Sequence, residues 1–152
     1  MAVAAFTRSG SSASYAIVTS DVLYGGRGSA VVVEATFQCE ADASSMVTGR
    51  CTSTLTSLAS IRDGVMGFTM LEGARAVTTF EHGAGLFAIV ASHKYGPKRR
   101  DGVQLIDLST PGAPLAAGAA IDDVTPGFTA LGGACGVATF RSATSTYAVV
   151  LV

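Results

Sequence analysis

The strongest constraint on the fold of this chain is an internal repeat of 60 residues. Residues 67–92 align without gaps on residues 127–152, and 11 of the 26 aligned positions are identical. A third copy lies near the start of the chain, because residues 15–18 (YAIV) match residues 87–90 (FAIV) and 147–150 (YAVV). A repeat of this length indicates similar supersecondary units that pack on one another. The chain therefore contains two whole units and the opening of a third.

Each unit has the pattern of four short β-strands. In the middle unit, apolar or β-branched runs occur at residues 76–80, 86–91, 102–108 and 115–121, and polar or turn-forming residues separate them. Glycine, threonine and valine are frequent and no helical period is sustained, which argues against helices. The sequence therefore predicts an all-β fold of blade-like sheets, each with four antiparallel strands.

One segment of the middle unit resembles a known repeat family. Residues 102–111 (GVQLIDLSTP) look like the signature of LVIVD-type β-propeller repeats. The resemblance covers the middle unit fully and the third as far as it runs. It is weaker in the first unit, where residues 28–33 (GSAVVV) keep the strand without the turn, and the units are longer than the family's usual blade. It implies that residues 73–77 form an innermost strand, and we expect Asp107 and Ser109 to cap the turn.

The resemblance predicts an incomplete ring of propeller blades. A single repeat array over residues 1–152 would divide into a first blade at 1–74, a second at 75–134 and two strands of a third at 135–152. Propellers close with about four to eight blades, so the ring would stay open. Because the apolar run 147–152 would then have an unpaired edge, we expect further blades or self-association.

The first unit differs from the others by an insertion bounded by two cysteines. Its offset from the second unit is 74 residues rather than 60, and the 14 extra residues fall in the stretch that contains Cys39 and Cys51. We expect a lengthened hairpin between strands at 30–38 and 52–60, pinned by a disulfide; two unpaired thiols are the alternative. A disulfide would contribute about 3 kcal/mol and would favour an extracellular or secretory compartment. The third cysteine, Cys135, is expected to be a small buried residue.

Composition argues against several classes of partner. The chain has 10 basic and 11 acidic residues and a net charge of −1, so it lacks the basic footprint of a nucleic-acid binder. Its apolar stretches are far shorter than the ~20 residues of a membrane-spanning helix. The cysteines and histidines do not have the spacing of zinc ligands, so we expect no metal and no cofactor. We expect His82 and His93 to be solvated.

Two loops carry the residues that we expect to bind a partner protein or ligand. A Tyr-Gly pair followed by arginine recurs after the second strand of the first and second units, on one rim of the expected propeller. Tyrosine and arginine are frequent at binding hot spots, and loops on a rigid scaffold often carry function. A solvated basic loop is the alternative. The candidate binding residues are Tyr24, Arg27, Tyr95, Lys98, Arg99 and Arg100.

A group of carboxylates is a weaker candidate for chemistry. Asp63 and the pair Asp122-Asp123 occur at equivalent places before the repeated Gly-Phe-Thr motif. Clustered carboxylates can bind Ca²⁺, but we favour an ordinary polar loop. The sequence contains no nucleophile elbow and no phosphate-binding loop.

These observations predict a non-catalytic repeat module that binds a protein or ligand. One alternative is a metal-dependent propeller hydrolase of the lactonase type, which would need carboxylate or asparagine ligands at a central channel. The chain contains no asparagine. The other alternative is a fragment without independent function.

Overall fold

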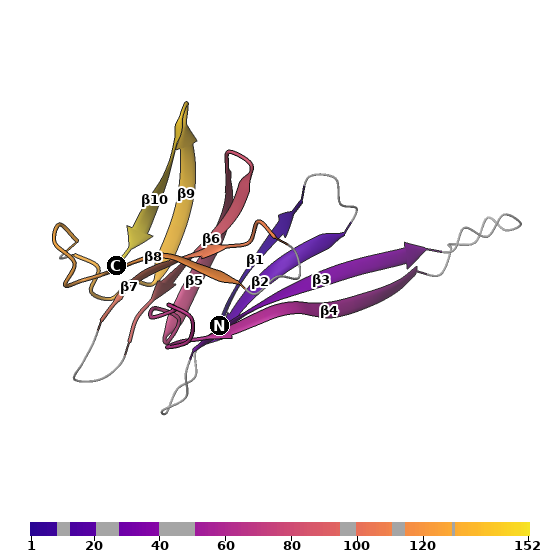
Figure 1. Ribbon diagram of the computed structural model, residues 1–152, viewed down its shortest axis with the longest axis horizontal. Coiled ribbons are helices and arrows are strands. Elements are labelled where there is room, and N and C mark those ends of the chain that lie inside the picture. The colour runs from indigo at the N-terminus through magenta and orange to yellow at the C-terminus, as the bar shows by residue number, and fades with distance from the viewer. Residues whose placement is uncertain (9–12, 21–27, 40–50, 95–99, 111–114, 129) are drawn as a thin grey trace, which may run out of the picture.

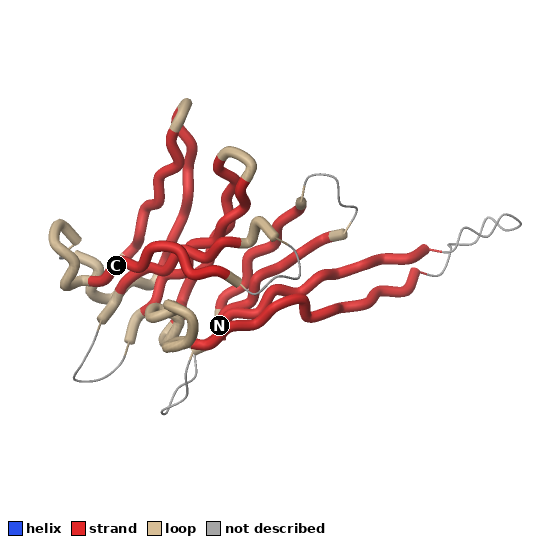
Figure 2. Tube along the Cα trace, viewed as in Figure 1, coloured by secondary structure: helices blue, strands red, loops and turns tan. Residues whose placement is uncertain are grey.

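The computed structural model describes the chain except at several short stretches. These are residues 9–12, 21–27, 40–50, 95–99, 111–114 and 129. The described residues form ten β-strands and no helix (Figure 2). The prediction of an all-β fold is therefore confirmed. Within the same residues, nothing qualifies as a helix long and apolar enough to cross a membrane.

The first sheet contains four strands in sequence order. β1 (Ala2–Thr7), β2 (Ser14–Ser20), β3 (Ser29–Cys39) and β4 (Cys51–Arg62) pair antiparallel in the order β1-β2-β3-β4. In β2, buried side chains alternate with more exposed ones. Since successive side chains of a strand point to opposite faces, this alternation shows that one face of the sheet lies in the core.

The second sheet repeats this arrangement. β5 (Ala74–His82), β6 (Gly85–Ser92), β7 (Gly102–Asp107) and β8 (Ala116–Asp122) pair antiparallel in the order β5-β6-β7-β8. The four strands predicted for the middle unit are thus confirmed, with ends that differ by at most two residues.

A two-stranded hairpin follows the second sheet. β9 (Gly136–Ser142) and β10 (Ser145–Leu151) pair with each other. The two sheets and the hairpin stand side by side in sequence order, with β1 against β5 and β5 against β9 (Figure 1). No strand pairing closes the array of described residues into a barrel. The fold is therefore an open row of blade-like antiparallel sheets, as the sequence predicts.

The 60-residue repeat is visible in the backbone that connects the units. The N–H of Phe68 donates to the carbonyl of Val65, and the N–H of Phe128 donates to the carbonyl of Thr125. The glycine before each phenylalanine has a positive φ, 84° in one case and 88° in the other. Because glycine adopts such angles without steric cost, the repeated glycines specify the same turn twice.

The main core lies between the two four-stranded sheets. Ile17 and Val32 enter it from the first sheet, and Ile106 and Leu108 enter it from the second. Phe68, from the connection between the sheets, is fully buried among them. Each large aliphatic side chain buried in this way contributes about 1.5–3 kcal/mol, so this interface holds the first two units together.

Side chains in the second sheet close the turn that resembles the propeller signature. The N–H of Ser109 donates to Oδ1 of Asp107 at 2.8 Å. The N–H of Leu86 donates to Oγ of Ser109 at 3.0 Å. The predicted capping roles of Asp107 and Ser109 are confirmed.

A buried amide links β7 to the connection between the first two units. Gln104 is fully buried, and its Oε1 accepts a hydrogen bond from the N–H of Thr69 at 3.1 Å. Its Nε2 donates to the carbonyl of Gly118 at 3.1 Å. The ladder between β7 and β8 shifts register between Gln104 and Ile106. The amide of Gln104 therefore forms hydrogen bonds with a backbone carbonyl at this irregularity in the sheet and with a backbone N–H in the connection outside it.

Strands β3 and β4 continue as a two-stranded arm. The pairing of β2 with β3 ends at Ala35, whereas the β3–β4 ladder runs on until Cys39 stands opposite Cys51. We call residues 36–39 and 51–54 the arm; it extends away from the sheets (Figure 1). The predicted lengthened hairpin is confirmed. The side chain of Cys39 lies outside the described part of the structure, so the disulfide stays a prediction.

Candidate binding face and cleft

Each unit carries one cross-strand aromatic pair at the same place. The two members are direct partners in the ladder, an arrangement in which stacked rings stabilise a sheet by about 0.5–1.5 kcal/mol. We call the face of each sheet that carries its pair the front face, and the opposite one the back face. The pairs are Phe6–Tyr15 and Phe80–Phe87, with ring centroids 5.5 Å apart, and Phe140–Tyr147, at 5.2 Å.

The exposure of this aromatic pair rises along the chain. Phe6 and Tyr15 are 8% and 7% exposed, the pair of the second sheet is half-buried, and Phe140 and Tyr147 are 52% and 48% exposed. The second sheet covers the front face of the first, and the hairpin covers part of the front face of the second. The front face of the hairpin is left open to solvent.

The back faces carry the packing between units. On the back face of the second sheet, Ala88, Val90 and Ile106 are fully buried against the first sheet. On its front face, Ile89 and Leu105 are only half-buried. The same strands therefore present one covered and one partly open apolar face.

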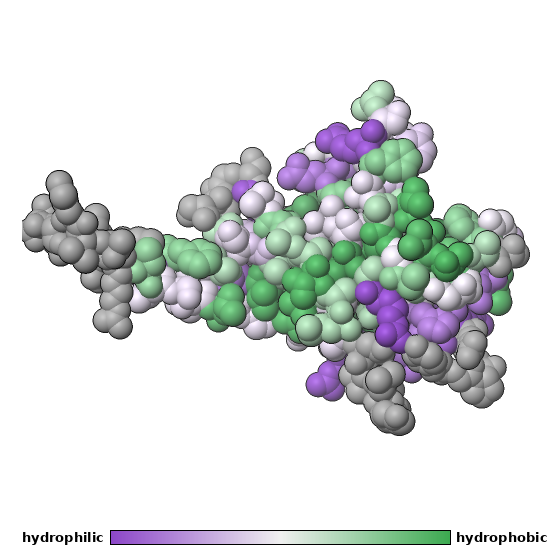
Figure 3. All heavy atoms as spheres, turned by 180° about the vertical axis from the view of Figure 1, so that it is seen from behind, coloured by the Kyte–Doolittle hydropathy of each residue, from purple (hydrophilic) through white to green (hydrophobic). Residues whose placement is uncertain are grey.

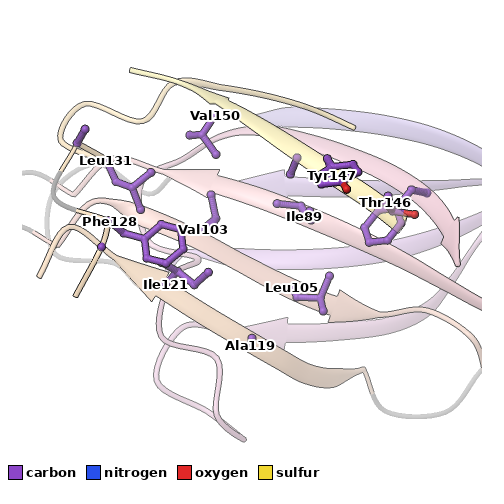
Figure 4. A pocket seen from close by; sticks show the side chains of 14 residues that line it. Ile89, Val103, Leu105, Ala119, Ile121, Phe128, Leu131, Thr146, Tyr147 and Val150 are labelled. Atoms are coloured by element: carbon purple, nitrogen blue, oxygen red, sulfur yellow. The ribbon is translucent and has the colours of Figure 1, made fainter. Parts of the chain in front are cut away.

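An apolar cleft of about 620 Å³ opens between the front face of the second sheet and β10. Val103 and Leu105 of β7 line one side, and Tyr147 and Val150 of β10 line the other (Figure 4). Phe128, from the connection to the hairpin, also lines it. Seen from behind, apolar side chains gather in a broad band over the body of the molecule (Figure 3). The cleft is suited to apolar side chains.

One edge of β10 lies free beside this cleft. In both four-stranded sheets the second strand pairs on both sides, β2 with β1 and β3, and β6 with β5 and β7. Among the described residues, β10 pairs with β9 only. Its other edge therefore presents unpaired backbone N–H and C=O groups, which are a template for a further strand.

A buried carboxylate holds the connection to the hairpin in place. Asp101 has a side chain only 4% exposed. Its Oδ2 accepts hydrogen bonds from Nδ1 of His93 at 2.9 Å and from the N–H of Gly133 at 2.6 Å, and its Oδ1 accepts one from the N–H of Lys94 at 2.9 Å. Burial raises the pKa of Asp101, but these bonds and the charge of His93 outweigh it and hold the pKa below its ordinary 3.8.

Two of the three carboxylates considered for Ca²⁺, those of Asp122 and Asp63, have partners within the protein, whereas Oδ1 of Asp123 is buried without a hydrogen-bond partner among the described residues. Oγ1 of Thr125 donates to Oδ1 of Asp122 at 2.6 Å. This bond lowers the pKa of Asp122 below 3.8 against the effect of burial, with help from the charge of Arg100. Oδ2 of Asp63 lies 3.2 Å from Nζ of Lys94. These contacts engage Asp122 and Asp63, and the ordinary polar loop stays a prediction.

The basic rim predicted from the sequence is described at one residue only. Arg100 forms an ion pair with Asp122 at 3.3 Å, and its side chain is 62% exposed. The remaining candidates lie outside the described residues: Tyr24, Arg27, Tyr95, Lys98 and Arg99.

Two expectations about individual residues are wrong. Cys135 is exposed rather than buried, because it stands directly before the hairpin, which is covered on one side only. The expectation that His93 is solvated is wrong because its side chain is only 20% exposed and pairs with Asp101. His82 is exposed, as expected, with Nδ1 3.3 Å from Oγ1 of Thr146.

Sequence reasoning missed the aromatic front face and the cleft as a site. The signal was present, because Phe80 and Phe140 align in the repeat and Tyr15 and Tyr147 align on Phe87. The alignment does not give the strand register that brings these residues together as pairs. It also does not give the packing of the sheets on one another, which leaves one of the three pairs exposed.

Comparison with family models, curated proteins and solved structures gives no match for this chain.

Proposed function

We propose that this chain is a non-catalytic β-repeat module, of the propeller type that its sequence resembles, and that it binds a pair of β-strands at β10. The observation that carries the proposal is the apolar cleft of about 620 Å³ beside the unpaired edge of that strand. Strand addition of this kind takes affinity from main-chain hydrogen bonds and specificity from alternate side chains.

The second sheet supplies the template for the added strands. There β6 pairs with β7 so that Ala88 stands opposite Ile106, on the back face. Ala148 of β10 is the repeat counterpart of Ala88 and lines the cleft. A strand added to β10 in the same register would place an apolar side chain opposite Ala148, while the strand after it would lie along the cleft. The favoured partner is therefore an antiparallel hairpin with alternating apolar residues, supplied by a protein or a further blade.

A peptide that copies the chain's own outer hairpin tests this proposal. Fluorescein-labelled peptide 100–123, which spans β7 and β8, is titrated with the full chain and followed by fluorescence anisotropy. We expect saturable binding, and no binding of a scrambled peptide. Phe128→Asp should weaken binding at least about tenfold, because a carboxylate would be buried in an apolar cleft.

The matched control for this variant is Val124→Asp. Val124 is 63% exposed, lies in the same connection and does not line the cleft, whereas Phe128 is 44% exposed and does. The control should bind the peptide like the wild type. Equal binding by the wild type and Phe128→Asp would refute the cleft as the binding site, as would equal binding of the scrambled peptide.

We also propose that the arm is pinned by a disulfide between Cys39 and Cys51. The two residues are direct partners at the end of the β3–β4 ladder. A two-stranded ribbon is marginally stable by itself, and the disulfide would add about 3 kcal/mol. Mass spectrometry after alkylation without reduction should find only Cys135 modified. Modification of all three cysteines under those conditions would contradict the pairing.

A further inference from the structure

The front face of the hairpin is an open apolar surface. Phe140, Tyr147, Val149 and Leu151 all lie on it, and they are 52%, 48%, 53% and 64% exposed. In the first sheet, the equivalent of Val149 is Ile17, which is fully buried beneath the second sheet. A cluster of exposed apolar side chains on one face marks an interaction surface.

The opposite end of the row presents a second open apolar face. On the back face of the first sheet, Val3 stands opposite Val18, Val18 opposite Val31, and Ala16 opposite Val33. Val3 is 56% exposed and the other four are half-buried. This face has no described sheet packed on it.

The chain itself shows how a back face fits a front face. The back face of the second sheet carries Val77, Ala88 and Val90, which pack against the core formed with the front face of the first sheet. The interface places small and β-branched side chains beside a stacked aromatic pair. The equivalent back-face residues are of the same types in the other units, Val3, Ala16 and Val18 in the first and Val137, Ala148 and Val150 in the third.

We infer that the back face of the first sheet of a second copy covers the front face of hairpin β9–β10, in a head-to-tail contact. Both faces repeat the residues of an interface that the chain already forms internally. Neither face carries a charged residue on β1–β3 or on β9–β10; on β4, Arg62 stands opposite Ser29 at the edge of the back face and is exposed. Such a contact is heterologous, so it builds a ring if the rotation closes and a filament if it does not.

This contact is separate from the strand-binding function, because it uses the front face of the hairpin and not the edge of β10. Val149→Asp blocks the front face, and Val3→Asp blocks the back face. Thr54→Asp, on the exposed arm, is the matched control. Sedimentation velocity over a concentration series measures the association of each chain.

We expect the wild type and the control to associate and each blocked variant to be monomeric. The dissociation constant of each blocked variant should rise at least about tenfold, because an unpaired carboxylate would enter an apolar interface. An equimolar mixture of the two blocked variants should form dimers and nothing larger. In that mixture one partner keeps an intact back face and the other keeps an intact front face.

Three outcomes would overturn the inference. The first is a wild type that is monomeric at every concentration. The second is a Val3→Asp variant that associates like the wild type, which would indicate a front-to-front contact. The third is a mixture that stays monomeric although both variants unfold cooperatively. Leu151→Lys and Ala5→Lys, on the same two faces, replace any variant that fails to fold. None of these outcomes affects the peptide titration, so failure of this contact and failure of strand binding are distinguishable.

Discussion

Asp101→Asn exchanges a buried carboxylate for an amide of nearly the same shape. The carboxylate accepts hydrogen bonds from the side chain of His93 and from the N–H groups of Lys94 and Gly133. An amide has one acceptor oxygen, and its NH₂ group can only donate. In the variant, at least one of the three donors therefore faces another donor.

The size of the effect follows from these contacts. Hydrogen bonds to a charged group contribute about 1.5–3 kcal/mol each, and the Asp101 side chain is 4% exposed, so solvent cannot replace them. The variant loses the charge in all three bonds and the geometry of at least one. We expect the free energy of unfolding at neutral pH to fall by about 3 kcal/mol.

Urea unfolding followed by far-UV circular dichroism measures this loss. With an m-value of about 2 kcal/mol/M, the midpoint should fall by about 1.5 M. The pKa of Asp101 in the folded chain lies below 3.8. The stability that it contributes is therefore complete above pH 3.8 and disappears as the pH falls through the folded pKa. The difference between the wild type and the variant should shrink in that acid range.

Asp107→Asn is the matched control, because Asp107 accepts one hydrogen bond, at 2.8 Å, in an exposed turn. It should cost less than about 1 kcal/mol. The reasoning would be refuted if Asp101→Asn also cost less than about 1 kcal/mol. It would equally be refuted if the difference between wild type and Asp101→Asn did not change between neutral and strongly acid pH.

Five further substitutions test the packing. Gln104→Leu removes the hydrogen bonds to the N–H of Thr69 and to the carbonyl of Gly118, so the Tm should fall by about 2–12 °C; an unchanged Tm would contradict this role. A Cβ at Gly118 would lie 2.8 Å from side-chain atoms of Leu105, so Gly118→Ala should cost about 1–3 kcal/mol. Leu105→Ala in the same chain should relieve part of that cost, whereas strict additivity would argue against a clash. Phe6→Ala should cost about 3–5 kcal/mol and Phe140→Ala less than about 1 kcal/mol; equal costs in urea unfolding would show that the two pairs are equally covered.

Much of the fold could be predicted because its signals are local. The four strands of the middle unit follow from apolar runs and turn residues, and the caps at Asp107 and Ser109 act within a few residues or across one ladder. The lengthened hairpin followed from an offset of 74 residues in place of 60. Side-chain alternation and turn formation depend on residues that are close together along the chain, and the sequence gives these residues directly.

The candidate site was less predictable because it depends on contacts between units. The basic rim is predicted from residue type alone, and only Arg100 of it lies in the described part of the structure. The role of Asp101 depends on Gly133, which lies 32 residues away in the chain. The burial of His93 and the exposure of Cys135 both depend on which surfaces are covered by a neighbouring sheet.

By itself, the sequence determined the repeat, the strands, the turns and the recurrence of an aromatic position in every unit. The tertiary structure alone decided which of the three aromatic pairs meets solvent. Phe6 is 8% exposed and its counterpart Phe140 is 52% exposed, although both occupy the same place in their units. The physical reason is that the burial of a side chain depends on what packs across its face of the sheet, and similar local sequences can have different neighbours.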